Sequence, residues 1–192
     1  MEKIKWGIIG PGNIANNFAD GLKGSYSGQL VSIASKSEDR RKNFGDKYDI
    51  HPDFRFDSYE DIINSEHIDA IYISTPHTLH AEWTIKAAGK GKHILCEKPG
   101  AINFNEGKKI IDAVREAGVF YMEGFMYRCH PQIPKLVDII KNKIIGDVIS
   151  VETSFGFDMG KTIPDHRLFN KNLAGGGILD VGLYPISFTR LI

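Results

Sequence analysis

The sequence predicts an α/β fold that begins with a Rossmann domain, a doubly wound parallel sheet. An apolar run over residues 4–9 predicts a buried strand, a glycine turn at 10–12 follows it directly, and a helical pattern comes next. Apolar β-rich runs then alternate with helical patterns as far as residue 122. The 192 residues, 42% hydrophobic and 25% charged, suffice for one large core or two small domains.

The charge balance and the cysteines argue against several classes of protein. Lysine and arginine number 24, and aspartate and glutamate also number 24, so the net charge favours neither nucleic acid nor an anionic membrane as partner. Cys96 and Cys129 lie in apolar sequence surroundings without CxxC spacing, which suits reduced thiols in a cytoplasmic protein. The first apolar run is too short for a signal peptide or a membrane span.

The opening turn has the composition of a dinucleotide-binding turn. Gly10 allows a sharp bend, Gly12 lets the backbone approach a pyrophosphate, and Ala15 replaces the third glycine where helix and strand pack closely. The N–H groups at the new helix start would then face the anion. We therefore expect Gly10, Gly12, Asn13 and Ile14 to bind the cofactor.

The second strand, expected over residues 29–34, ends where a Rossmann domain selects its cofactor. A carboxylate there accepts the ribose 2′-hydroxyl of NAD, whereas this sequence has Ser35 and Lys36, with Arg40 one helical turn further on. Hydroxyls and cations are partners for a 2′-phosphate, so NADP is the predicted cofactor and NAD the alternative. The competing interpretation is an ordinary loop whose Lys36 and Arg40 face water.

Two helices expected after this strand carry no chemistry. Residues 37–48 favour the first. The pattern Ser58-x-x-Asp61 predicts the start of the second, which runs to about Asn64.

The run 69–74 predicts another strand, followed by a loop and a helix over 81–88. Ligands of doubly wound sheets lie at the carboxyl ends of strands, so we expect Thr75 and Pro76 to shape the wall near the nicotinamide ribose. His77 and His80 follow three residues apart, but no third ligand stands at suitable spacing, so no metal site is expected. His80 is expected at the helix start as a hydrogen-bonded structural group beside the cofactor.

A strand expected over 92–96 delivers Glu97, Lys98 and Pro99 at its carboxyl end. Because this end faces the same edge as the glycine turn, the Lys98 ammonium would lie beside both substrate and nicotinamide. Glu97 is expected next to the cofactor as well.

The remaining elements complete a first domain over 1–123 and open a second over 124–192. We expect a helix over 104–117, a strand over 119–122, a helix over 132–141, a long strand over 148–157 and a helix from Asp180 to the end of the chain. The second domain is thus expected to be the start of an α+β open-sheet domain. Arg167 lies in a loop before the glycines at 175–177, where it is either a substrate contact or a solvated side chain.

Three motifs stand in order along the chain: Gly10-Pro11-Gly12-Asn13-Ile14-Ala15, then Glu97-Lys98-Pro99, then the glycine-rich run over 175–185. Together they resemble the glucose-fructose oxidoreductase/inositol dehydrogenase (Gfo/Idh/MocA) family over nearly the whole chain. Tyr184 and the segment 122–131 most resemble its branch of NADP-dependent xylose dehydrogenases and dihydrodiol dehydrogenases, since inositol dehydrogenases have a histidine at the position of Tyr184.

The resemblance implies NADP-linked oxidation of a sugar or a related cyclic alcohol, with Lys98, Asp180 and Tyr184 at the catalytic positions. It also implies that Arg128 lies near the cofactor, the alternative being an interdomain salt bridge. The expected cofactor-binding residues are Gly10, Gly12, Asn13, Ile14, Ser35, Lys36, Arg40, Thr75, Pro76, His80, Glu97, Lys98 and Arg128. The expected partner is a small molecule.

The three catalytic candidates also make chemical sense without the resemblance. Asp180 and Tyr184, four residues apart, share one face of a helix that begins near Asp180. A phenol with a pKa near 10 needs a nearby cation to exchange a proton at neutral pH, and Lys98 would supply it. The competing interpretation is a Tyr184 that packs by its ring and an Asp180 that caps the helix.

The last expected helix has no stop signal, so the chain looks C-terminally truncated. The family places several more strands after this helix, in a sheet that usually joins subunits, so the full-length protein is expected to be a homo-oligomer. Two rival functions are a nicotinamide-cofactor-binding sensor or regulatory protein and an inactive truncated product.

Overall fold

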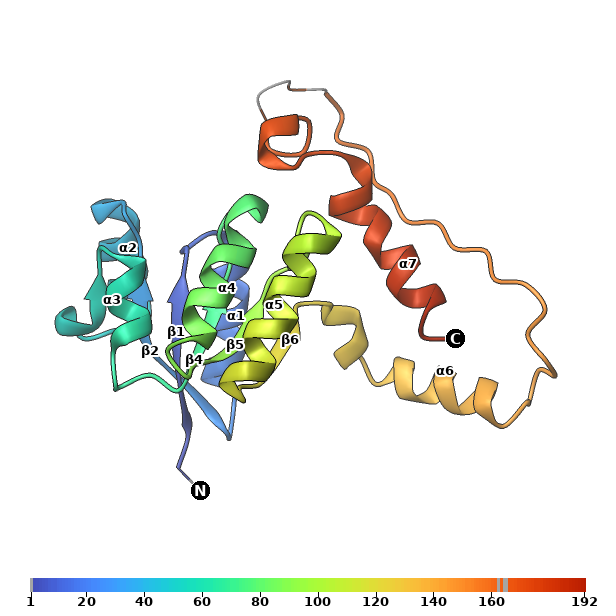
Figure 1. Ribbon diagram of the computed structural model, residues 1–192, viewed down its shortest axis with the longest axis horizontal. Helices are drawn as coiled ribbons and strands as arrows, with labels where there is room; N and C mark the ends of the chain where they lie inside the picture. The colour runs from blue at the N-terminus through green and yellow to red at the C-terminus, as the bar shows by residue number, and fades with distance from the viewer. Residues whose placement is uncertain (1, 162, 164–165) are drawn as a thin grey trace. The chain divides into compact units, whose positions relative to one another are not determined.

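The computed structural model describes residues 2–161, 163 and 166–192 (Figure 1). The chain divides into two compact units, Met1–Glu123 and Gly124–Ile192. The first unit is a sheet covered by helices on both faces, and the second consists of helical segments joined by extended chain.

A six-stranded parallel sheet forms the centre of the first unit. Its order, β3-β2-β1-β4-β5-β6, changes direction at β1, as in a Rossmann fold. The strands are β1 (Ile4–Ile9), β2 (Gly28–Ala34), β3 (Arg55–Phe56), β4 (Ala70–Ile73), β5 (His93–Cys96) and β6 (Tyr121–Glu123). The predicted fold class is confirmed, and β3 is the strand of this sheet that the apolar runs did not predict.

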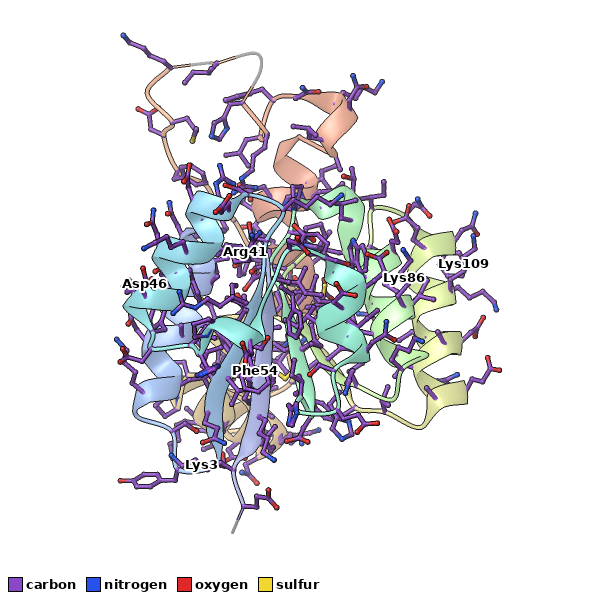
Figure 2. The ribbon with its side chains drawn as sticks, turned by 90° about the vertical axis from the view of Figure 1, so that its left-hand side faces the viewer. Lys3, Arg41, Asp46, Phe54, Lys86 and Lys109 are labelled. Carbon is purple, nitrogen blue, oxygen red and sulfur yellow. The ribbon has the colours of Figure 1, made fainter. Side chains whose placement is uncertain are left out.

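Five α-helices cover the two faces of the sheet. They are α1 (Asn13–Lys23), α2 (Glu38–Lys47), α3 (Tyr59–Asn64), α4 (His80–Ala88) and α5 (Phe104–Ala117). Figure 2 looks along the sheet and shows Asp46 of α2 on one side, with Lys86 of α4 and Lys109 of α5 on the other. The helices therefore form the outer layers of a three-layer sandwich.

Side chains at alternate strand positions point to opposite faces of the sheet, and each face has its own hydrophobic core. Ile8 packs with Ala15, Ile33 and Phe44, in the core under α1 and α2. Ile9 points to the opposite face, into the core under α3, α4 and α5. Ala15 is 0% exposed, at the position where the turn sequence predicts close packing of helix on strand.

Side chains fix several helix starts. The Ser58 hydroxyl accepts from the N–H groups of Glu60 and Asp61 at 3.1 and 3.3 Å, so the predicted start of α3 is confirmed. Asn103 Oδ1 accepts from the N–H of Glu106 at 2.9 Å at the start of α5. These caps explain why polar patterns located the helix boundaries so closely.

The second unit contains five helical segments among its described residues. They are η3 (Met126–Cys129), α6 (Gln132–Lys141), η4 (Lys171–Leu173), the π-helical η5 (Ile178–Gly182) and α7 (Leu183–Thr189). The expected helix over 132–141 is confirmed. The last helical run begins at Ile178 as a π-turn, two residues before the expected start at Asp180, so Asp180 lies inside η5 and does not cap it.

The prediction of a strand over 148–157 was wrong. These residues pair with no strand within the described part of the chain, and nearly all of their side chains are exposed. Alternation of polar and apolar residues gives a segment two different faces, but a strand also needs a hydrogen-bonded neighbour.

The cysteines differ in their surroundings. Cys96 is fully buried at the end of β5, as expected. Cys129 is exposed, which corrects the expectation of apolar surroundings. Both are free thiols. Among the described helices, none has the length and apolarity needed to cross a membrane.

Candidate cofactor and catalytic site

The opening turn at the end of β1 accepts glycine alone at Gly10. Its φ is +91°, a conformation that L side chains rarely adopt, and a Cβ there would lie 3.0 Å from the Ser74 carbonyl oxygen. The Ser74 hydroxyl donates to the Gly10 carbonyl at 2.8 Å. The turn is therefore held tightly against the end of β4.

At Gly12 the absence of a side chain matters for a different reason. A Cβ at Gly12 would meet no protein atom within 4 Å, so the space over the turn is open. The N-terminus of α1 has no side-chain cap and no acidic residue in its first turn, whereas side chains cap α2, α3 and α5. Free N–H groups at a helix start bind anions, so the turn fits a phosphate. Asn13 and Ile14 are exposed beside it.

The loop after β2 and the first turn of α2 each place a cation near the carboxyl edge of the sheet. Lys36 and Arg40 are exposed there, and Lys36 Nζ lies 5.9 Å from the ring centroid of Tyr59. Ser35 is buried, and its carbonyl accepts from Arg41 Nη1 at 2.7 Å. Figure 2 shows Arg41 near this end of the sheet. No sequence signal pointed to Arg41, because the contact depends on how the loop folds back on α2.

The end of β4 contains a buried hydroxyl that lacks a partner. Thr75 is 7% exposed, and its Oγ1 makes no hydrogen bond within the described structure. Pro76, the next residue, is exposed. An unsatisfied buried hydroxyl costs about 1–3 kcal/mol, so Thr75 is suited to receive a polar ligand group at this edge.

His80 ties two of these strand-end loops together. Its Nε2 lies 2.8 Å from the Thr75 carbonyl oxygen and its Nδ1 lies 2.7 Å from the Pro99 carbonyl oxygen. The ring is 0% exposed. The expectation that His80 is a hydrogen-bonded structural group is confirmed, and its place beside the cofactor stays a prediction.

Glu97 connects the end of β5 to the sheet interior. Its Oε1 accepts from the Tyr72 hydroxyl at 2.6 Å, and its Oε2 accepts from the Lys98 N–H at 3.3 Å. The Tyr72 ring stacks on Phe18 of α1 with 4.1 Å between centroids. Burial, and then the Glu97 charge, raise the pKa of Tyr72 far above its usual value, so this phenol stays protonated and donates.

A second carboxylate holds the same turn from the other side. Glu123, the last residue of β6, accepts from the Gly100 N–H at 2.8 Å. Sequence reasoning missed Glu123, although it ends a strand at the same edge as Glu97. Lys98 itself is half-buried in this turn.

The second unit holds the other two catalytic candidates. Asp180 is 9% exposed, and Arg167 Nη1 lies 3.9 Å from Asp180 Oδ1. Arg167 is therefore an ion-pair partner of Asp180, an arrangement that neither sequence interpretation of this arginine included. Tyr184 follows four residues later, at the start of α7.

Aromatic rings surround the Tyr184 phenol. Its ring centroid lies 5.2 Å from that of Phe155, 5.7 Å from that of Phe125 and 6.2 Å from that of Tyr127. A cavity of about 610 Å³ lies beside these rings and is also lined by Glu152. Tyr184 therefore packs by its ring and also borders open space.

Arg128 binds α7 within the second unit. Its Nη2 donates to the Ser187 hydroxyl at 3.1 Å and to the Ser187 carbonyl at 3.2 Å, and the Tyr127 hydroxyl lies 2.8 Å from the Ser187 hydroxyl. Neither sequence interpretation of Arg128 included this link. It fixes η3 to the helix that carries Tyr184.

The structure thus collects the expected site residues in two groups. The opening turn and the loops after β2, β4 and β5 lie at the carboxyl edge of the parallel sheet in the first unit. Asp180 and Tyr184 lie in consecutive helical segments of the second unit. Within the described residues, no group of three His, Cys, Asp or Glu side chains could hold a metal ion.

Comparison with known proteins gives a consistent result. Residues 4–125 match the family model GFO_IDH_MocA, described as an oxidoreductase family with an NAD-binding Rossmann fold. The chain is 34% identical over 188 residues, 98% of its length, to the D-xylose 1-dehydrogenase (NADP(+)) 2 of Haloferax volcanii. It is also 34% identical over 191 residues to the trans-1,2-dihydrobenzene-1,2-diol dehydrogenase of Mus musculus.

A solved structure shows the same architecture. The aldose-aldose oxidoreductase of Caulobacter crescentus, complexed with glycerol, superposes with a TM-score of 0.91 at 28% identity over 99% of this chain. The chain covers 57% of that structure, 57% of the Haloferax enzyme and 56% of the mouse enzyme. It therefore spans little more than half the length of these relatives.

Proposed function

This chain belongs to the GFO_IDH_MocA oxidoreductase family, and from that membership we propose that it transfers hydride between NADP(H) and a hydroxyl-bearing or carbonyl carbon of a sugar or related cyclic alcohol. The geometry of the opening turn supports this proposal most strongly. Gly10 bends with positive φ, the space over Gly12 is open, and α1 starts without a side-chain cap at the edge where β5 delivers Lys98.

The cofactor would lie along the carboxyl edge of the sheet. The pyrophosphate fits the N–H groups at Asn13 and Ile14, and the 2′-phosphate of NADP fits the exposed cations Lys36 and Arg40. The Thr75 hydroxyl, buried without a partner in the described structure, would meet a polar group of the nicotinamide half. An enzyme named for NADP(+) among the relatives supports NADP over NAD.

Three side chains would carry the chemistry. When bound, the nicotinamide supplies the hydride acceptor. Tyr184 Oη takes the hydroxyl proton of the substrate, and the Lys98 ammonium lowers the pKa of this phenol and orients the substrate. Asp180, held by Arg167, accepts a hydrogen bond from a substrate hydroxyl.

The substrate class follows from the relatives and from the surroundings of the phenol. The two sequence relatives are named for D-xylose and for a dihydrobenzenediol, which both carry a hydroxyl on a carbon. Aromatic side chains such as Tyr127 and Phe155 beside Tyr184 suit the apolar faces of cyclic molecules. We further propose that the whole protein is a homo-oligomer, because residues 148–157 expose apolar side chains at several positions. Its two free cysteines suit a cytoplasmic protein.

A substrate screen tests the proposal. The protein is incubated with aldoses, inositols and cyclic diols, each with NADP and with NAD, and the absorbance of the reduced nicotinamide is followed. The proposal expects reduction of NADP with at least one sugar or diol. Tight NADPH binding without turnover of any of them would favour a sensor or regulatory protein that kept the fold.

A further inference from the structure

Three side chains hold the turn over 98–100: one from α4, one from β6 and one from the residue just after β5. The N–H of its first residue donates to Glu97 at 3.3 Å, the carbonyl of Pro99 lies 2.7 Å from His80 Nδ1, and the N–H of its last residue donates to Glu123 at 2.8 Å. Proline has no N–H, so the first and last residues supply the only backbone donors of this turn. Glu123 makes the shorter of the two carboxylate contacts.

Glu123 is placed to reach across the end of the sheet. It pairs with Cys96 in the parallel ladder between β5 and β6, directly beside the point where β5 leaves the sheet. Gly100, whose N–H it accepts, is buried, and a Cβ on Gly100 would overlap the Tyr121 hydroxyl. Gly100 is therefore packed closely against β6, at the place where Glu123 accepts its N–H.

We propose that Glu123 is a positioning residue for Lys98, acting through the Gly100 N–H. The inference rests on the proposed function, in which the Lys98 ammonium orients the reactants. Glu97 and His80 fix the turn at its first and second residues, and Glu123 fixes it at the third. A misplacement of about 1 Å can cost on the order of a hundredfold in rate, so a contact that touches neither substrate nor cofactor can still control turnover.

Glu106 provides a matched control, because it binds the N–H of Ile102, two residues after Gly100. Glu106 of α5 accepts from the Ile102 N–H at 3.2 Å and from the Asn103 side chain at 3.2 Å. Glu106 and Glu123 are both carboxylates that bind a backbone N–H of the segment between β5 and α5. They differ in that Glu106 holds the helix start, whereas Glu123 holds the lysine turn.

Four variants of the native protein separate these roles. Glu123→Ala should lower kcat by about 10- to 100-fold while the Kd for NADPH changes by less than about threefold. Glu123→Gln keeps an oxygen acceptor and should recover most of kcat, whereas Glu123→Asp keeps the charge but cannot reach and should not. Glu106→Ala should leave kcat unchanged. A Glu123→Ala enzyme with wild-type kcat, or a Gln variant as slow as the Ala variant, would overturn the inference.

A double-mutant cycle tests whether the effect passes through Lys98. In a Lys98→Ala background, adding Glu123→Ala should lower kcat no further, because the group being positioned is already gone. Additive losses would mean that Glu123 acts elsewhere and would overturn the inference.

Amide hydrogen exchange decides the structural part without any turnover. Exchange over residues 97–101 should speed up in Glu123→Ala and, if that variant does not fold, in Glu123→Asp, but not in Glu106→Ala. Unchanged exchange in the Glu123 variants would contradict the proposed grip on the turn. If the wild type turns over no substrate, the proposed function fails, and the exchange result still decides whether Glu123 fixes this turn.

Discussion

Gly10 and Gly12 stand two residues apart in the same turn, but the structure constrains them differently. A side chain on Gly10 would be strained by its positive φ and would meet the Ser74 carbonyl, whereas a side chain on Gly12 would enter open space. The backbone conformation therefore requires glycine at position 10, whereas glycine at position 12 leaves space for a ligand.

Alanine substitutions at these two glycines should separate stability from binding. Gly12→Ala should lower the free energy of unfolding by less than about 1 kcal/mol, because it only changes the residue that caps α1. It should raise the Kd for NADPH by tenfold or more, since the methyl group occupies the phosphate space. Calorimetric titration measures the binding and urea unfolding measures the stability.

Gly10→Ala is the matched control for this prediction. It should lower the free energy of unfolding by about 1–3 kcal/mol, because the left-handed conformation and the close carbonyl both oppose a side chain. A Gly12→Ala protein that binds NADPH like the wild type would show that the phosphates do not lie over this turn.

Ionisation of the Cys96 thiol is expected to lower the stability of the folded protein at alkaline pH. Burial raises the pKa of Cys96 from its ordinary value of 9.0 to about 12. The folded state therefore favours the protonated thiol, and this contribution to stability is complete below about pH 9 and is lost as the pH rises towards 12. Tyr72 and Tyr121, whose pKa values burial also raises, act in the same direction.

Removal of the thiol should therefore flatten the alkaline limb of the stability curve. In urea unfolding between about pH 8 and pH 11, Cys96→Ala should lose less stability per pH unit than the wild type. Cys129→Ala, at an exposed position, should follow the wild-type slope. Equal slopes for all three proteins would mean that Cys96 ionises as easily in the folded chain as in the unfolded one.

At the scale of elements, we propose that the loop after β2 and the first turn of α2 select the nicotinamide cofactor. Lys36 and Arg40 should contact the 2′-phosphate of NADP, a group that NAD lacks. Replacing either by alanine removes a charge-assisted hydrogen bond worth about 1.5–3 kcal/mol, so the Kd for NADPH should rise by at least about tenfold. The Kd for NADH should stay nearly constant, as measured by fluorescence titration.

Lys42 provides the control for this loop. It is an exposed cation further along α2, and its ammonium pairs with Asp46 at 2.7 Å. Lys42→Ala should change the affinities for NADPH and NADH by similar, small factors. If Lys36→Ala and Arg40→Ala also weaken both cofactors equally, the two cations do not read the 2′-phosphate.

Elements with local signals were predicted well from the sequence. The Ser58 cap located α3, and apolar periodicity located α5 over residues 104–117, because caps and helix faces are encoded by residues close in sequence. The two-residue β3 has too little pattern to detect. Residues 148–157 have the alternation of a strand but find no pairing partner among the described residues, so local pattern alone misled.

For the candidate site too, local features could be predicted from the sequence, whereas contacts between distant residues could not. Strand ends are predictable, so Thr75, Glu97 and Lys98 were placed at the carboxyl edge from sequence alone. The contacts that hold this edge were not predicted, because Tyr72 binds Glu97 across 25 positions of the chain and Glu123 binds Gly100 across 23. Glu123 also ends a strand, so consistent use of the strand-end rule would have included it.

At the scale of the whole molecule, the two units carry different candidate residues. The first unit contributes a preformed turn and the Lys98 loop, both held by buried contacts from several elements. The second unit contributes Tyr184 on a helix fixed by Arg128. Turnover in this account needs both units, whereas NADPH binding needs the first.

The most direct test of that account is single-turnover kinetics of Tyr184→Phe beside the wild type, with a substrate found in the screen. The ring packs against Phe125 and Phe155, so loss of the hydroxyl should leave folding and the Kd for NADPH intact. Hydride transfer should slow by about 100-fold or more, because the general base is gone. A Tyr184→Phe protein that transfers hydride at the wild-type rate would contradict the account.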